Sequence, residues 1–197
     1  MRKRTETSAP DTPARIKPAR VFFALWPDAG AVQRLHDLAG TAHAICDGRR
    51  MRRDTLHLTL AFIGDVARER VADLIAAGDR VHAAAFTLTL DRIAAWRHNR
   101  IVWAGAKAIP DALSDLFEQL TAAVAEAGFP LEPRKFAPHV TLLRNARADL
   151  PGGEIDPPIE WRVRRFVLVE SDRRDDGSHY DPLESWALDS APKRQDR

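Results

Sequence analysis

The sequence predicts an α+β fold with mainly antiparallel sheet, arranged as two pseudo-symmetric lobes. Strands that neighbour each other as hairpins are mixed with helices along the chain, which is the order typical of this class. The tetrapeptide His-x-Thr-Leu occurs twice, at His57 and at His139, 82 residues apart and each time in a strand-like context. Random placement would give roughly 0.03 copies, so the repetition indicates a duplicated architecture. A chain of 197 residues is expected to form one domain or two fused halves.

The amino-terminal half is predicted to alternate strands and helices. The apolar run "RVFFALWPD" reads as a first strand that ends at Pro27. Asp28 is a suitable cap for a helix that continues to about His43. The alternating segment "TLHLTLAFIG" predicts a strand over 55–64, and the apolar spacing after it predicts a helix over 65–85.

The carboxy-terminal half is predicted to be richer in strands. A helix is expected after Pro110, ended by Gly128, because proline favours the first helical turn and glycine the end. The proline- and glycine-rich segment 150–160 is expected to be a loop. Further strands are predicted over 86–96, 100–107, 136–144, 161–171 and 180–188.

Composition places the folded domain at residues 19–189, between two tails. Residues 1–18 form a basic tail expected to be disordered, and residues 190–197 form a polar tail. The basic start is not followed by an apolar stretch, so we do not expect a secretory signal, and no apolar run is long enough to span a bilayer. The single cysteine, Cys46, excludes an internal disulfide and is expected to be an ordinary side chain rather than a nucleophile. These features favour a cytoplasmic protein.

The spacing within each tetrapeptide places its polar side chains on one face of a strand. His57 and Thr59 share a face, as do His139 and Thr141, while the apolar residues between them point the other way. If the two lobes face each other, one cleft receives two imidazoles and two hydroxyls. One neutral and one charged imidazole can divide the proton transfers of a displacement at phosphorus, and the hydroxyls can bind its oxygens.

Basic residues precede both motifs and indicate an anionic ligand, although solvated loops would explain them as well. They are Arg49, Arg50, Arg52, Arg53, Arg134 and Lys135. A zinc site is the competing interpretation of the paired histidines, but no further ligand stands at suitable spacing, so we expect no metal and no cofactor. Trp96, Trp103, Trp161 and Trp186 are expected in the core, with Trp96 as a candidate for stacking on a base.

The two tetrapeptides resemble those of the 2H phosphoesterase superfamily, and within it the bacterial RNA 2′,3′-cyclic phosphodiesterases, also called 2′-5′ RNA ligases. The resemblance extends over residues 19–189 and includes "RVFFALWPD", "LHLTLAFIGDV", "RKFAPHVTLLRNA" and "FVLVESDRRDDGSHYDPLESWAL". It implies antiparallel sheets that line a central cleft, with helices outside. It also implies metal-independent hydrolysis of 2′,3′-cyclic phosphate ends to 2′-phosphates.

The resemblance also implies roles for individual residues. His57 would be the proton donor and His139 the proton acceptor, while Thr59, Thr141 and Arg144 would bind the phosphate. Strict alternation puts Arg144 on the face opposite His139, so its role requires the strand to end or twist there. The residues expected to line the cleft for substrate are Phe22, Phe23 and Tyr180.

The expected partners are RNA termini or nucleoside 2′,3′-cyclic phosphates, with no membrane. We expect a monomer, because no apolar surface stripe stands out. Two alternatives stay open at this point: 2′-5′ ligation of RNA as the main role, and a protein that binds RNA ends without catalysis.

Overall fold

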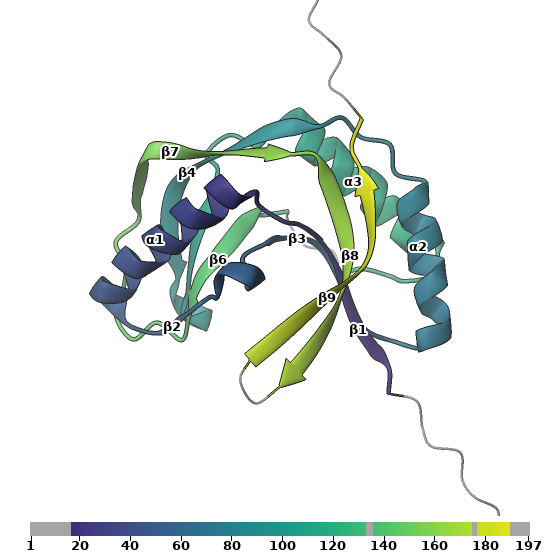
Figure 1. The fold of residues 1–197 in the computed structure, drawn as a ribbon, viewed down its shortest axis with the longest axis horizontal. Helices are drawn as coiled ribbons and strands as arrows, with labels where there is room; N and C mark the ends of the chain where they lie inside the picture. Colours follow the sequence, from purple (N-terminus) through teal and green to yellow (C-terminus); the bar gives the residue numbers. More distant parts are fainter. Residues whose placement is uncertain (1–16, 133–135, 175–176, 190–197) are drawn as a thin grey trace, which may run out of the picture.

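The computed structural model describes residues 17–132, 136–174 and 177–189 of the chain. In this part of the chain nine strands form one sheet in the order β7-β4-β5-β6-β3-β1-β8-β9, and β2 pairs with β6 (Figure 1). Its strand pairs are antiparallel, which confirms the predicted fold class. The strands are β1 (Ala19–Leu25), β2 (Arg49–Arg50), β3 (Leu58–Val66), β4 (Phe86–Trp96), β5 (Ile101–Gly105), β6 (His139–Arg144), β7 (Gly153–Val163), β8 (Arg165–Arg174) and β9 (Gly177–Ala187). The helices are α1 (Ala29–Cys46), α2 (Val71–Asp79) and α3 (Asp111–Glu126).

The sheet divides into two lobes of four strands that meet at its centre. The first lobe contains β3, β1, β8 and β9, and the second contains β6, β5, β4 and β7. Only one residue pair, Leu58 with Val140, joins β3 to β6 in the strand register. Helix α1 follows β1 of the first lobe but packs against β6 and β7, whereas α3 follows β5 of the second lobe and packs against β3. Each lobe is therefore covered by a helix whose preceding strand belongs to the other lobe (Figure 1).

Helix α1 begins where the sequence predicts. The Asp28 carboxylate accepts a hydrogen bond of 2.9 Å from the Ala31 amide, which satisfies one of the free N–H groups of the first turn. The helix continues three residues beyond the expected end, to Cys46, whose side chain is buried and forms no disulfide. The buried residues recur at helical spacing and face the sheet: Ala31, Leu35, Ala39, Ala42 and Cys46.

The prediction of a loop over 150–160 is wrong, because strand β7 begins at Gly153 and pairs with β4. Pro157 and Pro158 lie within it. They are tolerated because they lie in a break of the register with β4, between the paired residues Glu154 and Ile159, and because β7 is at the edge of the sheet. The second half of the strand alternates in burial, with Ile159, Trp161 and Val163 facing the core.

Two other expected elements have different bounds. The strand predicted over 161–171 is two strands, since Arg164 separates the end of β7 from the start of β8. The helix predicted over 65–85 is shorter, with a 3-10 turn at Arg68–Arg70 followed by α2. Strand β3 continues to Val66, so the first two residues of the predicted helix belong to this strand.

The predicted tail 190–197 and most of the predicted tail 1–18 lie outside the described residues. Lys17, which we expected in the first tail, forms an ion pair of 3.4 Å with Asp172 and accepts a hydrogen bond from Arg68 through its carbonyl oxygen. None of the described helices combines the length and the apolar composition needed to cross a membrane. One extensive apolar core joins the two lobes beneath the sheet.

Candidate active site

The two His-x-Thr-Leu motifs lie side by side where the lobes meet. Leu58 pairs with Val140 in antiparallel register, so His57 lies across from Thr141 and His139 across from Thr59. Leu58 and Val140 are fully buried, whereas the four polar residues are half-buried on the other face of the strands. His57 and His139 are therefore diagonal neighbours, a relation in which Cα atoms are about 7–8 Å apart, and this lets both imidazoles approach one small group.

Both imidazoles are oriented by the same local hydrogen bond. Nδ1 of His57 is 2.7 Å from the carbonyl oxygen of Thr55, and Nδ1 of His139 is 2.8 Å from that of Ala137. A carbonyl oxygen only accepts, so Nδ1 carries the proton in each ring. Nε2 is therefore the nitrogen of each ring whose lone pair is available to a ligand.

The protein environment favours the neutral form of both imidazoles. Burial lowers the pKa of His57 from 6.5 to about 4, and the charges of Arg144 and His139 act in the same direction, while the bond to Thr55 opposes them. Burial and Arg144 likewise lower the pKa of His139, against the bond to Ala137. Without a ligand, both histidines are neutral at neutral pH.

Aromatic rings surround His57. Trp26 stacks on its imidazole with centroids 5.1 Å apart and planes at 16°. The ring centroids of Phe22 and Tyr180 lie 5.0 and 5.1 Å from that of the same imidazole. Phe22 and Tyr180 line the cavity beside His57. The expectation for Phe23 is wrong, because this fully buried side chain projects from the other face of β1 against Phe166 and Trp186.

His139 has its own aromatic neighbours. The Trp96 ring contacts its imidazole edge to face, with ring centroids 4.5 Å apart, and the centroid of Trp103 lies 6.4 Å from that of the imidazole. Both tryptophans are half-buried rather than in the core, so the core assignment is wrong for them, whereas Trp161 is buried as expected. Trp186 is half-buried and donates a hydrogen bond of 2.7 Å to Asp79.

A β-bulge turns Arg144 toward the site. Thr141 pairs with Trp103 and Leu143 with Val102, so Leu142 is an extra residue in β6. Leu142 and Leu143 are both buried, so beyond them the alternation of side chains between the two faces of β6 is shifted by one residue. Arg144 thus lines the same cavity as His57, and its charge acts on both imidazoles.

A matching bulge in β3 exposes an aromatic residue that sequence reasoning missed. Leu60 is extra in the pairing of β3 with β1, and beyond it Phe62 is 51% exposed on the cavity wall. Phe62 stands 82 residues before Arg144, the same offset as between the histidines, and this offset was the signal that could have found it. The guanidinium of Arg20 lies over its ring at 4.7 Å.

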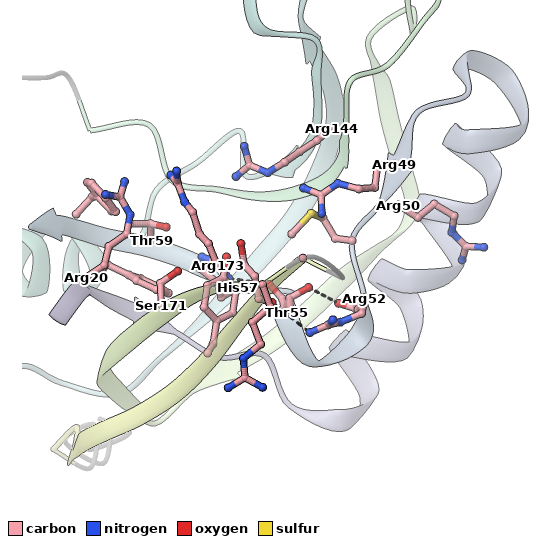
Figure 2. A pocket seen from close by; sticks show the side chains of 17 residues that line it. Arg20, Arg49, Arg50, Arg52, Thr55, His57, Thr59, Arg144, Ser171 and Arg173 are labelled. Atoms are coloured by element: carbon pink, nitrogen blue, oxygen red, sulfur yellow. Dashed lines mark hydrogen bonds between the residues drawn. The ribbon is translucent and has the colours of Figure 1, made fainter. Parts of the chain in front are cut away.

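The cavity beside His57 has a volume of about 560 Å³ and a strongly cationic wall (Figure 2). Thr59 also lines it, while His139 and Thr141 stand on the neighbouring strand and are not among its lining residues. The described residues that line it include no Asp or Glu but seven arginines: Arg20, Arg49, Arg50, Arg52, Arg144, Arg173 and Arg174. Such a surface attracts anions.

The expected basic residues upstream of the motifs have different outcomes. Arg49, Arg50 and Arg52 line the cavity, whereas Arg53 does not. Arg134 and Lys135 lie outside the described residues. Across the part of the chain that the structure describes, no three His, Cys, Asp or Glu side chains cluster closely enough to hold a metal ion.

Comparisons with known proteins agree with this arrangement. A family described as LigT like phosphoesterase matches residues 25–103 and 105–180. The RNA 2′,3′-cyclic phosphodiesterase of Escherichia coli K12 is 35% identical over 175 residues, which are 87% of this chain and 98% of that protein. The protein of the same name from Thermus thermophilus is 33% identical over 146 residues, or 68% of this chain and 72% of that protein. The crystal structure of E. coli LigT complexed with 3′-AMP has a TM-score of 0.81 at 33% identity and covers 87% of this chain and 99% of its own.

Proposed function

Because the chain belongs to the LigT like phosphoesterase family, we propose that it is an RNA 2′,3′-cyclic phosphodiesterase that hydrolyses terminal cyclic phosphates to 2′-phosphates. The observation that carries the proposal is the antiparallel pairing of Leu58 with Val140. It brings two Nε2 atoms and two threonine hydroxyls to one face of the sheet, beside the cation of Arg144. A phosphate with two ester oxygens needs this set of donors, acceptors and charge.

Binding of the cyclic phosphate uses its negative charge. Thr59 and Thr141 donate their hydroxyl hydrogens to the non-bridging oxygens, and the Arg144 guanidinium offsets the charge. The phosphate anion also acts on the imidazoles, because a nearby negative charge raises the pKa of a histidine. Binding therefore favours the uptake from solvent of the proton that the free site, with its lowered pKa values, does not hold at neutral pH.

Hydrolysis then needs one imidazole in each protonation state. His139 takes a proton from water through Nε2 as the water oxygen bonds to phosphorus. His57 gives the proton on its Nε2 to the departing 3′ oxygen as that P–O bond breaks. The ring opens to a 2′-phosphate and a free 3′-hydroxyl, and transfer of the proton between the two histidines restores the site. With an RNA 5′-hydroxyl in place of water, the same steps would join two RNA ends through a 2′-5′ linkage.

The test is hydrolysis of 2′,3′-cyclic AMP by the wild-type protein and by single histidine variants. We expect His57→Ala and His139→Ala each to lower kcat by about 10²–10⁴-fold, because each removes one proton transfer. His82→Ala is the matched control, since His82 lies outside the site on the described surface. Circular dichroism should show the same fold for all variants.

Product analysis separates the alternatives. A 2′-phosphate as product, with activity unaffected by EDTA, supports the proposal, and loss of activity on chelation would favour metal chemistry instead. Tight binding of a cyclic phosphate without turnover would instead assign the chain as a reader of RNA ends. Efficient joining of RNA halves with little hydrolysis would make ligation the main role.

We also propose that the enzyme acts as a monomer in the cytoplasm. One chain supplies all of the site residues described above, and its single cysteine, Cys46, is a buried free thiol. Sedimentation of the purified protein over a range of concentrations tests the monomer.

A further inference from the structure

The cavity beside His57 carries more positive charge than one cyclic phosphate requires. A terminal 2′,3′-cyclic phosphate bears a single negative charge, and Arg144 is placed to offset it. Seven arginines nevertheless line the cavity, although the chain as a whole has a net charge of only +2. A volume of about 560 Å³ is also in the range that accommodates a whole nucleotide rather than a phosphate alone.

Four of these arginines are engaged by the protein itself. Arg20 pairs with Asp65 at 3.2 Å, Arg52 with Asp54 at 3.2 Å and Arg174 with Asp172 at 2.9 Å. The Arg50 side chain points toward α1 (Figure 2). It donates a hydrogen bond of 3.1 Å to the carbonyl oxygen of His36 in this helix. Their charges are partly neutralised or directed away from the cavity.

The other three arginines have no such partner. The side chains of Arg49, Arg144 and Arg173 form no hydrogen bond or ion pair with any residue in the ranges that the structure describes. Arg49 and Arg144 face each other across β2 and β6. Like charges in directly opposite positions are destabilising, so this pair is held in place at a cost that a bound anion would remove.

Arg49 stands on β2 and Arg173 on β8, two of the elements that line the cavity. Nη1 of Arg49 lies 3.5 Å from the position that a Cβ on Gly177 would occupy, at the start of β9. Arg173 is near the end of β8, paired with Ser178, and Arg52 donates a hydrogen bond of 3.1 Å to the Ser178 carbonyl oxygen. The β8–β9 hairpin and β2 therefore form one wall, with a free guanidinium on each element (Figure 2).

We propose that Arg49 and Arg173 bind the internucleotide phosphate on the 5′ side of the terminal nucleotide, so that the preferred substrate is an RNA chain and not a nucleoside 2′,3′-cyclic phosphate. The inference rests on the proposed function. In an RNA chain this phosphodiester carries the negative charge next to the cyclic phosphate. Arg144 and the histidines engage the reacting group, and the second pair of cations engages its neighbour.

Four compounds isolate the second phosphate. They are 2′,3′-cyclic AMP, the same nucleotide with a 5′-phosphate, the dinucleotide ApA with a 2′,3′-cyclic end, and this dinucleotide with an uncharged methylphosphonate linkage. For the wild-type protein we expect kcat/KM to be about tenfold higher or more for the charged dinucleotide than for its methylphosphonate analogue, because a hydrogen bond to a charged group contributes this much. The 5′-phosphate should give the single nucleotide part of the same advantage.

Variants then assign the preference to residues. Arg49→Ala and Arg173→Ala should each reduce the ratio of kcat/KM between charged and uncharged dinucleotide. Arg144→Ala should lower kcat/KM for both dinucleotides and leave the ratio intact. Arg162→Ala, an exposed arginine on β7 outside the cavity, is the matched control and should leave both activity and ratio unchanged.

Binding measurements keep this test separate from that of the proposed function. The affinities of the same four compounds for the His57→Ala/His139→Ala variant report the preference without turnover. Log Kd for the charged dinucleotide should change more steeply with log salt concentration than for the uncharged one, by about 0.7 for each phosphate contact. Equal affinity and equal kcat/KM for the two dinucleotides, or an unchanged ratio in both arginine variants, would overturn the inference.

Discussion

The two imidazoles share one hydrogen-bond arrangement but differ in what surrounds them. Each donates Nδ1–H to the carbonyl oxygen two residues earlier. His57 is contacted by three aromatic rings, one of them stacked, whereas His139 meets the tryptophans Trp96 and Trp103 at steep angles. The two rings therefore lose different amounts of hydration, although their position in the repeated motif is the same.

The lowered pKa values predict the pH dependence of catalysis. In the proposed mechanism the free enzyme needs one charged and one neutral imidazole, and the pKa of each is below 6.5, with that of His57 at about 4. We expect a bell-shaped profile of kcat/KM with its maximum below pH 6.5, because both imidazoles are neutral above that range. Bound phosphate raises both pKa values, so the profile of kcat should have its maximum at higher pH.

Steady-state kinetics with 2′,3′-cyclic AMP from pH 4 to 9 measure both profiles. Titration of the imidazole resonances by NMR in the free protein gives the two pKa values independently. A maximum of kcat/KM at or above pH 7, or profiles of kcat and kcat/KM that coincide, would contradict the prediction.

At the scale of single residues, the sequence predicts those whose position follows from alternation. His57, Thr59, His139 and Thr141 stand where a period of two puts them. Arg144 does not, because the bulge at Leu142 depends on pairing with β5, which is distant in sequence.

The choice between Phe22 and Phe23 was also beyond the sequence. Both faces of β1 are covered by apolar residues, so neither aromatic is marked as outward. Phe22 belongs to a small apolar cluster on the site face, which includes Ala24, Val167 and Val169, and Phe23 belongs to the main core.

Among the elements, helix α1 starts at Ala29, three residues after Trp26, which stacks on His57. Trp26 is followed by Pro27 and the cap Asp28, so the cap also determines how the chain leaves β1. We expect Asp28→Ala to lower the free energy of unfolding by about 1 kcal/mol, because the amide of Ala31 loses its acceptor. Asp28→Asn is the matched control and should retain most of the stability.

Urea denaturation measures this change, with an m-value that is the same in all three proteins. A loss as large in Asp28→Asn as in Asp28→Ala would show that the negative charge, and not the cap hydrogen bond, stabilises this end of the helix.

Elements with a clear period were predictable, and those defined by their neighbours were not. The sequence predicts β4 over its full length, since its apolar residues alternate over 86–90 and an apolar run continues to Trp96. Strand β7 was assigned to a loop because Pro157 and Pro158 argue against a strand, and a break in its register with β4 together with its place at the edge of the sheet permits them. Strand β2 has two residues and exists through its pairing with β6, so no periodicity could reveal it.

In the molecule as a whole, the two lobes are linked by the central strand pair and by two helices that pack on the opposite lobe. Strands β3 and β6 meet at the single pair Leu58 and Val140, and each of α1 and α3 crosses to the other lobe. The repeated tetrapeptide predicts two lobes. It does not predict the exchange of helices, which depends on contacts between residues far apart in the chain.

This architecture predicts that packing at the junction controls catalysis more than packing elsewhere. Leu58 is fully buried directly between His57 and Thr59, and it is the only residue of β3 whose register joins it to the second lobe. Leu88, on β4, is equally buried but belongs to one lobe only. We expect both Leu58→Ala and Leu88→Ala to lower the free energy of unfolding by about 2–5 kcal/mol.

The two variants should differ in activity. Leu58→Ala should lower kcat on 2′,3′-cyclic AMP by up to about 10²-fold, because a shift of about 1 Å between catalytic groups has an effect of this size. Leu88→Ala should keep a kcat near that of the wild type at a temperature where circular dichroism shows all three proteins folded. Equal kcat values in both variants would mean that the central strand pair does not position the histidines, and that the exchanged helices alone hold the two lobes in register.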